Sequence, residues 1–195
     1  MKKVLFFAIT LVAAGLVISC MPSDSTDATG PAKASLTFNT VKVQKHDGPI
    51  NWMTWDEAVK ANEKTGKKIF IDFYTNWCHW CKKMDSSTFS DPAVAEYINK
   101  NFYPVKFNAE RKDDIVFKGT TFKYQPGGRG GVHMLANELL NGHLGYPSYV
   151  YLTPEYERIL ISPGYKPVPD MKKELKFVAE DHYNTTTWDA YKRAN

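Results

Sequence analysis

Two cysteines, Cys78 and Cys81, are separated by two residues and lie where a predicted strand gives way to a predicted helix. The first sulfur of such a pair lies at the helix N-terminus, where unpaired N–H groups and the helix dipole favour a negative charge. We therefore expect Cys78 to be the attacking thiolate and Cys81, one turn later, to be the more buried resolving thiol. Together the two sulfurs could open a substrate disulfide by thiol–disulfide exchange.

The same spacing of cysteines also occurs in haem, zinc and purely structural sites. Covalent haem attachment needs a histidine directly after the second cysteine, and here that residue is Lys82. A structural zinc site needs two more ligands. His133 and His143 could provide them only if the fold happened to bring them next to the cysteines. A structural disulfide stays open as an alternative, although so short a loop constrains the unfolded chain little. We predict neither a metal nor an organic cofactor, because the two sulfurs themselves hold the electrons.

The third cysteine, Cys20, follows a segment that is typical of secretory signals. Two lysines precede an apolar run over residues 4–18 that is too short for a comfortable membrane span. Residues 17–20 resemble the bacterial lipobox, and this resemblance implies that the signal is cleaved and that Cys20 is acylated. We predict a lipoprotein signal peptide over residues 1–19. An ordinary cleaved signal with an incidental cysteine is the alternative.

Residues 20–35 are rich in Ser, Thr, Asp, Pro, Ala and Gly and have no apolar period, which predicts a flexible tether. Residue 21 is not an acidic retention signal, so the usual sorting pattern of lipoproteins favours the outer over the inner membrane. We therefore expect a protein on the periplasmic side of a bacterial cell envelope, held to the membrane by a lipid on Cys20. The folded domain is predicted over residues 36–195.

Composition limits the possible partners. The chain has 195 residues, of which 43% are hydrophobic and 24% are charged, so its body is globular rather than disordered. The formal net charge is +4, and no block of basic residues accumulates. We therefore expect no nucleic-acid surface and no polybasic membrane patch. Three cysteines are too few for a disulfide scaffold.

Helix and strand signals alternate along the body, which predicts an α/β layer fold with a sheet covered on both faces. Helices are predicted after the capping box at residues 54–57, after Cys78, and after the Asp-Pro pair at residues 91–92. The expected strands are residues 36–43, 68–74, 102–107, 148–152 and 158–162. A last helix is expected from residue 169 to about residue 183.

The segment over residues 68–82 resembles the active-site strand and helix of the thioredoxin superfamily. Its continuation over residues 84–94 is similar to the C-terminal periplasmic domain of the thiol–disulfide interchange protein DsbD and to single-domain relatives. The resemblance covers about residues 52–183. It implies a thioredoxin-like fold, in which helices flank a central mixed sheet, with an insertion over about residues 113–144 before the cis-proline loop.

The resemblance also assigns a buried acid and its partner. Asp72 lies six residues before Cys78 and matches the carboxylate that assists proton transfer at the second cysteine, which here is Cys81. A strand carboxylate is otherwise expensive to bury, which independently indicates a task or a partner for Asp72. Lys106 matches the lysine that pairs with this acid. The alternative for Lys106 is an ordinary solvated strand residue.

Substrate contacts are implied at three further positions. Tyr146-Pro147 matches the cis-proline loop of the family, where the backbone of Tyr146 would pair with an extended substrate. A trans proline that merely starts a strand is the alternative. Trp77 precedes Cys78 as it does in the family, and we expect it to shield the site.

The chain departs from the thioredoxin pattern in two places. His79-Trp80 lies between the cysteines, where thioredoxins have Gly-Pro. A protonated His79 would favour the thiolate and raise the reduction potential, while Trp80 adds apolar surface for substrate contact or packing. The insertion is predicted to hold a hairpin over residues 115–124, a glycine-rich turn over residues 126–131 and a short helix to residue 140. Long insertions beside a site often carry specificity.

These observations predict an enzyme, a protein thiol–disulfide oxidoreductase of the cell envelope that acts as a disulfide reductase. Its expected partners are protein disulfides and, by resemblance, a transmembrane thiol reductase that supplies electrons. Two alternatives remain at this point. One is a redox-inactive thioredoxin-fold module that binds proteins, and the other is a disulfide isomerase or oxidase.

Overall fold

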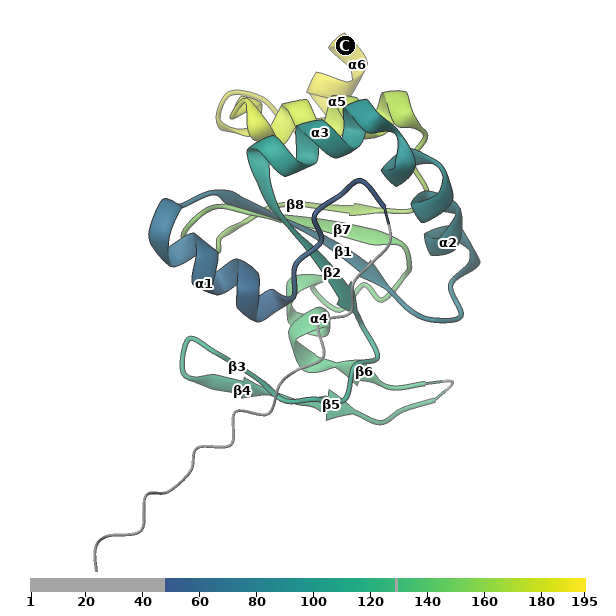
Figure 1. The fold of residues 1–195 in the computed structure, drawn as a ribbon, viewed down its shortest axis with the longest axis vertical. Helices are drawn as coiled ribbons and strands as arrows, with labels where there is room; N and C mark the ends of the chain where they lie inside the picture. Colours follow the sequence, from purple (N-terminus) through teal and green to yellow (C-terminus); the bar gives the residue numbers. More distant parts are fainter. Residues whose placement is uncertain (1–47, 129) are drawn as a thin grey trace, which may run out of the picture. The chain divides into compact units, whose positions relative to one another are not determined.

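The computed structural model describes residues 48–128 and 130–195 (Figure 1). The predicted signal peptide, Cys20, the tether and the strand over residues 36–43 lie outside the described residues and stay predictions. The helices are α1 (Trp55–Thr65), α2 (His79–Ser86), α3 (Pro92–Asn101), α4 (Met134–Leu139), α5 (Val168–Ala179) and α6 (Trp188–Ala194), with 3-10 turns η1 (Thr88–Ser90) and η2 (His182–Asn184). The strands are β1 (Lys68–Tyr74), β2 (Phe102–Asn108), β3 (Ile115–Phe117), β4 (Thr120–Phe122), β5 (Tyr124–Gln125), β6 (Val132–His133), β7 (Ser148–Leu152) and β8 (Arg158–Pro163).

A mixed sheet of four strands in the order β2-β1-β7-β8 forms the centre of the described part. β1 pairs in parallel with β2 and antiparallel with β7, and β7 pairs antiparallel with β8. This register places Asp72 on β1 between Lys106 on β2 and Tyr149 on β7. The sheet agrees with the predicted central mixed sheet.

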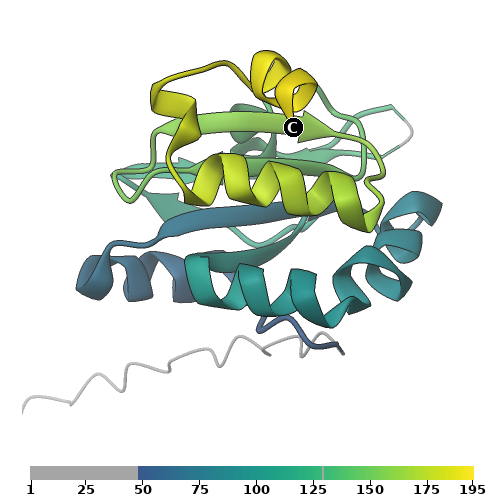
Figure 2. The ribbon, with the colours of Figure 1, turned by 90° about the horizontal axis from the view of Figure 1, so that it is seen from above.

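Helices cover both faces of this sheet. α3 and α5 lie side by side on one face, and α1 and α4 lie on the other (Figures 1 and 2). Alternate side chains of a strand point to opposite faces, and β1 follows this rule. Phe70 packs in the core beneath α3 and α5, while Ile71 and Phe73 pack in the core beneath α1 and α4. By the same alternation, Asp72 lies on the face of Phe70.

Local capping chemistry sets the bounds of the helices near the cysteines. Thr54 and Glu57 form the predicted capping box at the start of α1, and Gly66 ends that helix in the left-handed conformation at φ 60°. Asp91 caps α3, with Val94 N–H donating to its Oδ1 at 3.0 Å. These helices agree with the sequence prediction.

The C-terminal helix differs from the prediction, because α5 ends at Ala179 instead of continuing to about residue 183. Lys68 Nζ donates to the Ala179 carbonyl at 3.3 Å and pairs with Asp181 at 2.8 Å. Asp181 adopts a left-handed conformation at φ 61°, which turns the chain away from the helix axis. A further helix, α6, was not among the predicted elements, and its Trp188 packs on Phe177.

The insertion forms two small antiparallel ribbons and helix α4 (Figure 1). β3 and β4 make the predicted hairpin, and β5 and β6 pair across the predicted glycine-rich turn. His133 caps α4 with Nδ1, which accepts from Leu135 N–H at 3.2 Å, while Nε2 donates to the Asp113 carbonyl at 3.1 Å. Among the described helices, none is both long enough and apolar enough to cross a membrane.

Candidate active site

Cys78 and Cys81 form a disulfide at the start of α2. Cys78 is the N-cap residue of the helix, and its Sγ accepts a hydrogen bond from Cys81 N–H at 3.1 Å. Each cysteine exposes only 3% of its surface. The first sulfur therefore faces the N–H groups at the beginning of the helix, where a thiolate would be stabilised.

A buried lysine joins two carboxylates next to this helix. Lys106 Nζ lies 2.6 Å from Asp72 Oδ2 and also pairs with Asp85 Oδ1. Asp72 and Lys106 are buried, whereas the Asp85 side chain is 47% exposed. Cys81 and Asp85 are four residues apart and share one face of α2. Lys106 therefore links the face of α2 that carries Cys81 to the carboxylate on β1.

The environment of Asp72 favours its protonated form. Burial raises the pKa of Asp72 above its ordinary value of 3.8, although the neighbouring ammonium of Lys106 acts in the opposite direction. Burial by itself would lower the pKa of Lys106, but the carboxylates of Asp72 and Asp85 outweigh it and raise that pKa. Asp72 Oδ1 has no hydrogen-bond partner among the described residues. Asp72 can therefore take up a proton while Lys106 keeps its charge.

Three side chains next to the disulfide project into solvent. Trp77 is 65% exposed and Trp80 is 54% exposed, and His79 is exposed as well. The Trp80 ring lies 5.4 Å from the ring of Tyr165, which belongs to the loop between β8 and α5. These rings leave apolar surface uncovered next to the cysteines.

The predicted loop before β7 contacts the residue that precedes the first cysteine. The peptide bond between Tyr146 and Pro147 is cis, and Pro147 is buried. The Tyr146 ring meets the Trp77 ring edge-on, with 6.1 Å between centroids. The backbone N–H and C=O of Tyr146 make no hydrogen bond within the described part of the chain. Burial raises the pKa of the Tyr146 hydroxyl to about 12, so it is neutral at physiological pH.

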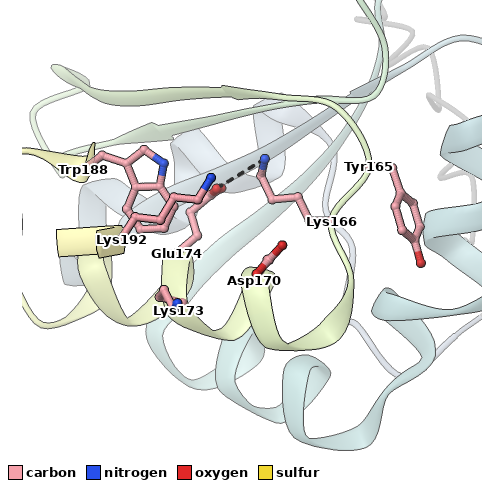
Figure 3. Close-up of a pocket in the computed structure, with 7 residues that line it drawn as sticks. All are labelled: Tyr165, Lys166, Asp170, Lys173, Glu174, Trp188 and Lys192. Atoms are coloured by element: carbon pink, nitrogen blue, oxygen red, sulfur yellow. Dashed lines mark ion pairs between the residues drawn. The ribbon is translucent and has the colours of Figure 1, made fainter. Parts of the chain in front are cut away.

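A second buried carboxylate, Glu174 on α5, pairs with Lys166 of the loop that also carries Tyr165 (Figure 3). Glu174 accepts hydrogen bonds from the hydroxyls of Tyr151 at 2.9 Å and Ser162 at 2.5 Å, and Lys166 Nζ lies 3.6 Å away. Burial raises the pKa of Glu174, against the opposing effect of Lys166. A cavity of about 140 Å³ adjoins this group.

The Glu174 cluster positions the loop against α2. Lys166 N–H contacts Met84 Sδ on α2 at 3.4 Å, and the Lys166 carbonyl accepts from the Thr88 hydroxyl at 2.6 Å. The contact between the buried Glu174 and the partly buried Lys166 therefore helps to hold a loop that itself supports the helix of the disulfide.

The structure brings most of the sequence-derived site residues together, and it adds two. Asp85 was not among the predicted site residues, and it contacts Lys106. Its spacing of four residues from Cys81 indicated only that it shares a face of the helix with that cysteine. Glu110, also not predicted, accepts from Trp77 Nε1 at 2.9 Å and lies in the turn after β2. No group of three His, Cys, Asp or Glu side chains suited to a metal occurs among residues 48–128 and 130–195.

Curated relatives share only part of their length with this chain. An uncharacterized protein of Caenorhabditis elegans is 28% identical over 147 residues, which make up 75% of this chain and 18% of that protein. The thiol:disulfide interchange protein DsbD of Ralstonia nicotianae is 49% identical over 39 residues, or 20% of this chain and 6% of that protein. The chain thus spans less than a fifth of the length of these relatives.

Among solved structures, a thioredoxin from Thermus thermophilus matches with a TM-score of 0.51 at 18% identity, over 72% of this chain and 98% of that one. At this low identity the match supports the fold alone. This structural match confirms the predicted thioredoxin-like fold. Residues 39–193 match the family Thioredox_DsbH, which is described as a protein of unknown function, DUF255. Since that match covers most of the sequence, the chain belongs to the Thioredox_DsbH family, a DsbH/DsbD-like family of the thioredoxin fold.

Proposed function

We propose that this chain is a protein disulfide reductase of the bacterial cell envelope, with Cys78 as nucleophile and Cys81 as resolving thiol. The observation that carries this proposal is the placement of the Cys78–Cys81 disulfide at the N-terminus of α2, beside the buried Asp72–Lys106 pair. A disulfide that served stability alone would not need an ionisable pair buried next to its helix.

The reaction begins with the reduced form of the protein. The Cys78 thiolate attacks one sulfur of a substrate disulfide, forms a mixed disulfide and releases the other substrate sulfur as a thiolate. The N–H groups at the start of α2 stabilise the attacking anion. The Tyr146 backbone, which is unpaired among the described residues, and the exposed rings of Trp77 and Trp80 would hold the substrate segment, with His79 and Pro147 beside it.

The second half of the reaction releases the substrate. Cys81 gives its proton to Asp72, and its thiolate attacks the Cys78 sulfur of the mixed disulfide. The substrate leaves as its second thiolate, so that it has gained two electrons and the protein has become oxidised. Lys106 is a positioning residue here, because it holds the Asp72 carboxylate from one side while burial raises the pKa of that carboxyl.

Electrons must then return to the Cys78–Cys81 pair. We propose that a membrane thiol reductase supplies them, and the partial similarity to DsbD supports this class of donor. We also propose that an acylated Cys20 anchors the domain on the periplasmic side of the envelope, preferentially at the outer membrane. The lipobox-like sequence before Cys20 supports the anchor.

The experiment is a reductase assay combined with a trap. Wild-type chain should reduce insulin disulfides with dithiothreitol as electron source, and Cys78→Ser should abolish this activity. Cys81→Ala should accumulate mixed disulfides with envelope proteins in the cell, because Cys78 can attack but the adduct cannot be resolved. The matched control is the double variant Cys78→Ala/Cys81→Ala, which should trap nothing.

Full insulin-reducing activity of Cys78→Ser would refute the proposal. The reduction potential of the pair decides the direction of electron flow, because a value well below that of glutathione favours a reductase. A value near or above that of glutathione would assign an isomerase or oxidase instead. A bond that neither glutathione nor thioredoxin opens would assign a binding module.

A further inference from the structure

A groove of about 350 Å³ opens between Trp77 and Tyr146 on one side and the insertion on the other. The insertion contributes Pro126, Val132 and Leu144 to a largely apolar lining. The volume falls within the range of about 300–1,000 Å³ that is typical of ligand sites. Because Trp77 directly precedes the first cysteine, the groove begins beside the disulfide and extends over the insertion.

Tight backbone contacts fix the insertion side of this groove. Gly131 N–H donates to the Tyr124 hydroxyl at 3.0 Å, and a side chain at Gly131 would collide with the Tyr124 ring and the Gln125 carbonyl. His133 N–H donates to the Ala109 carbonyl at 2.7 Å, which ties the insertion to the end of β2. A groove held in this way needs little ordering when a ligand binds, and preformed sites bind more tightly for that reason.

Glu110 supplies the only formal charge among the described residues that line the groove. Its Oε1 accepts from Trp77 Nε1 at 2.9 Å, and its backbone N–H donates to Asn108 Oδ1 at 2.9 Å. Glu110 forms no ion pair within the described part of the chain, and its Oε2 accepts no hydrogen bond there. The carboxylate is therefore oriented by Trp77, and no cation of residues 48–128 or 130–195 pairs with it.

We propose that this groove binds the segment of a substrate protein next to its reacting cysteine, and that Glu110 selects segments pairing an apolar side chain with a lysine or arginine. The inference rests on the proposed function, because it assigns the substrate class of the same site. Trp77 and Leu144 expose 65% and 44% of their surface, which an apolar side chain would cover. An acidic segment would instead place like charges together beside the groove, so Glu110 also rejects such segments.

The test measures binding without thiol chemistry. Short peptides carry serine in place of cysteine, leucine on one side of it, and arginine, glutamine or glutamate on the other, in both orders. Their dissociation constants for the oxidised full chain are measured from the shift of the Trp77 indole N–H resonance. We expect the arginine peptide to bind about three- to fivefold more tightly than the glutamine peptide, as for a partly exposed ion pair, and the glutamate peptide to bind least.

Glu110→Gln keeps an acceptor for Trp77 Nε1 and removes only the charge, so the preference for arginine should fall to nearly one. The matched control is Glu138→Gln, which changes an exposed carboxylate on the same insertion outside the groove lining, and it should keep the wild-type preference. Equal affinities for the arginine and glutamine peptides in the wild type, or an unchanged preference in Glu110→Gln, would overturn the inference.

A separate assay isolates the proposed function. Reduced wild-type chain is mixed with a small aromatic disulfide that is too small to extend along the groove, and release of the aromatic thiol is followed. If thiol is released but no peptide is preferred, the proposed peptide selection by Glu110 is wrong and the proposed reductase activity is retained. If a peptide preference depends on Glu110 but no thiol is released, the proposed reductase activity is wrong and the groove is a peptide-binding site.

Discussion

Replacing Lys106 by methionine would remove the only hydrogen-bond partner that the Asp72 carboxylate has among the described residues. Methionine keeps an unbranched chain near the rings of Trp52 and Phe89, whose centroids lie 4.9 and 5.4 Å from Lys106 Nζ. A thioether also packs well against aromatic rings. The substitution therefore tests the buried charge more than the volume of the side chain.

The size of the effect depends on pH. Removing one partner of a buried ion pair costs about 3–5 kcal/mol, unless the remaining group becomes neutral. Burial already raises the pKa of Asp72 above 3.8, and loss of Lys106 would raise it further. A carboxyl with a raised folded-state pKa keeps its proton in the folded chain but loses it on unfolding. Stability then falls as pH rises from 3.8 toward the folded-state pKa, by about 1.4 kcal/mol per pH unit.

The loss caused by Lys106→Met should therefore be small near about pH 5 and reach about 3–5 kcal/mol near about pH 8. Urea unfolding of the oxidised chain, followed by tryptophan fluorescence, measures it at both pH values. Asp72→Asn in the same background removes the titrating group and should restore most of the stability at the higher pH. An equal loss at both pH values, or no rescue by Asp72→Asn, would show that the buried charge of Asp72 does not cause the loss of stability.

Three further outcomes are expected. Asp85→Asn should change the free energy of unfolding by less than about 1 kcal/mol, because Asp85 is half exposed, yet prolong the mixed disulfide in a quenched single turnover. Burial lowers the pKa of His133 below 6.5, so stability is lost as pH falls from 6.5 toward the folded-state pKa, and His133→Gln should flatten this loss in urea unfolding. Glu174→Ala should lower the free energy of urea unfolding by about 2–4 kcal/mol, because the hydroxyls of Tyr151 and Ser162 lose their carboxylate acceptor and the Lys166 ammonium keeps only the Pro163 carbonyl, while Glu174→Gln should cost less.

Local chemistry made much of the fold predictable. The starts of α1 and α3 are each marked by a short sequence signal. These signals are the capping box of Thr54 and Glu57 and the pair formed by Asp91 and the proline after it, so both helix starts can be predicted from sequence. The end of α5 could not be read in this way. It is set by Lys68, which comes from β1 and contacts Asp181 across more than a hundred residues of sequence. Long-range ion pairs of this kind leave no local pattern.

The candidate site divides in a similar way. The contact between Asp72 and Lys106 was predictable from the resemblance to the thioredoxin superfamily. The two residues lie in register on neighbouring parallel strands. The place of Asp85 on the helix face of Cys81 was predictable from helical spacing alone, since it lies four residues after Cys81 on a helix that was itself predicted. Glu110 was not predictable, because its contact with Trp77 depends on the turn after β2 and on how the insertion returns to that turn.

The second carboxylate on Lys106 explains how a buried acid can exchange a proton without leaving an unbalanced charge. When Asp72 binds a proton, Lys106 would become a buried cation with a neutral neighbour, which is costly. Asp85 remains paired with Lys106 in that state and keeps the cluster balanced. Because Asp85 is half exposed, its carboxylate stays in contact with water and its charge costs little desolvation. The position of Asp85 on the face of α2 that also carries Cys81 would therefore support the role of proton acceptor that we propose for Asp72.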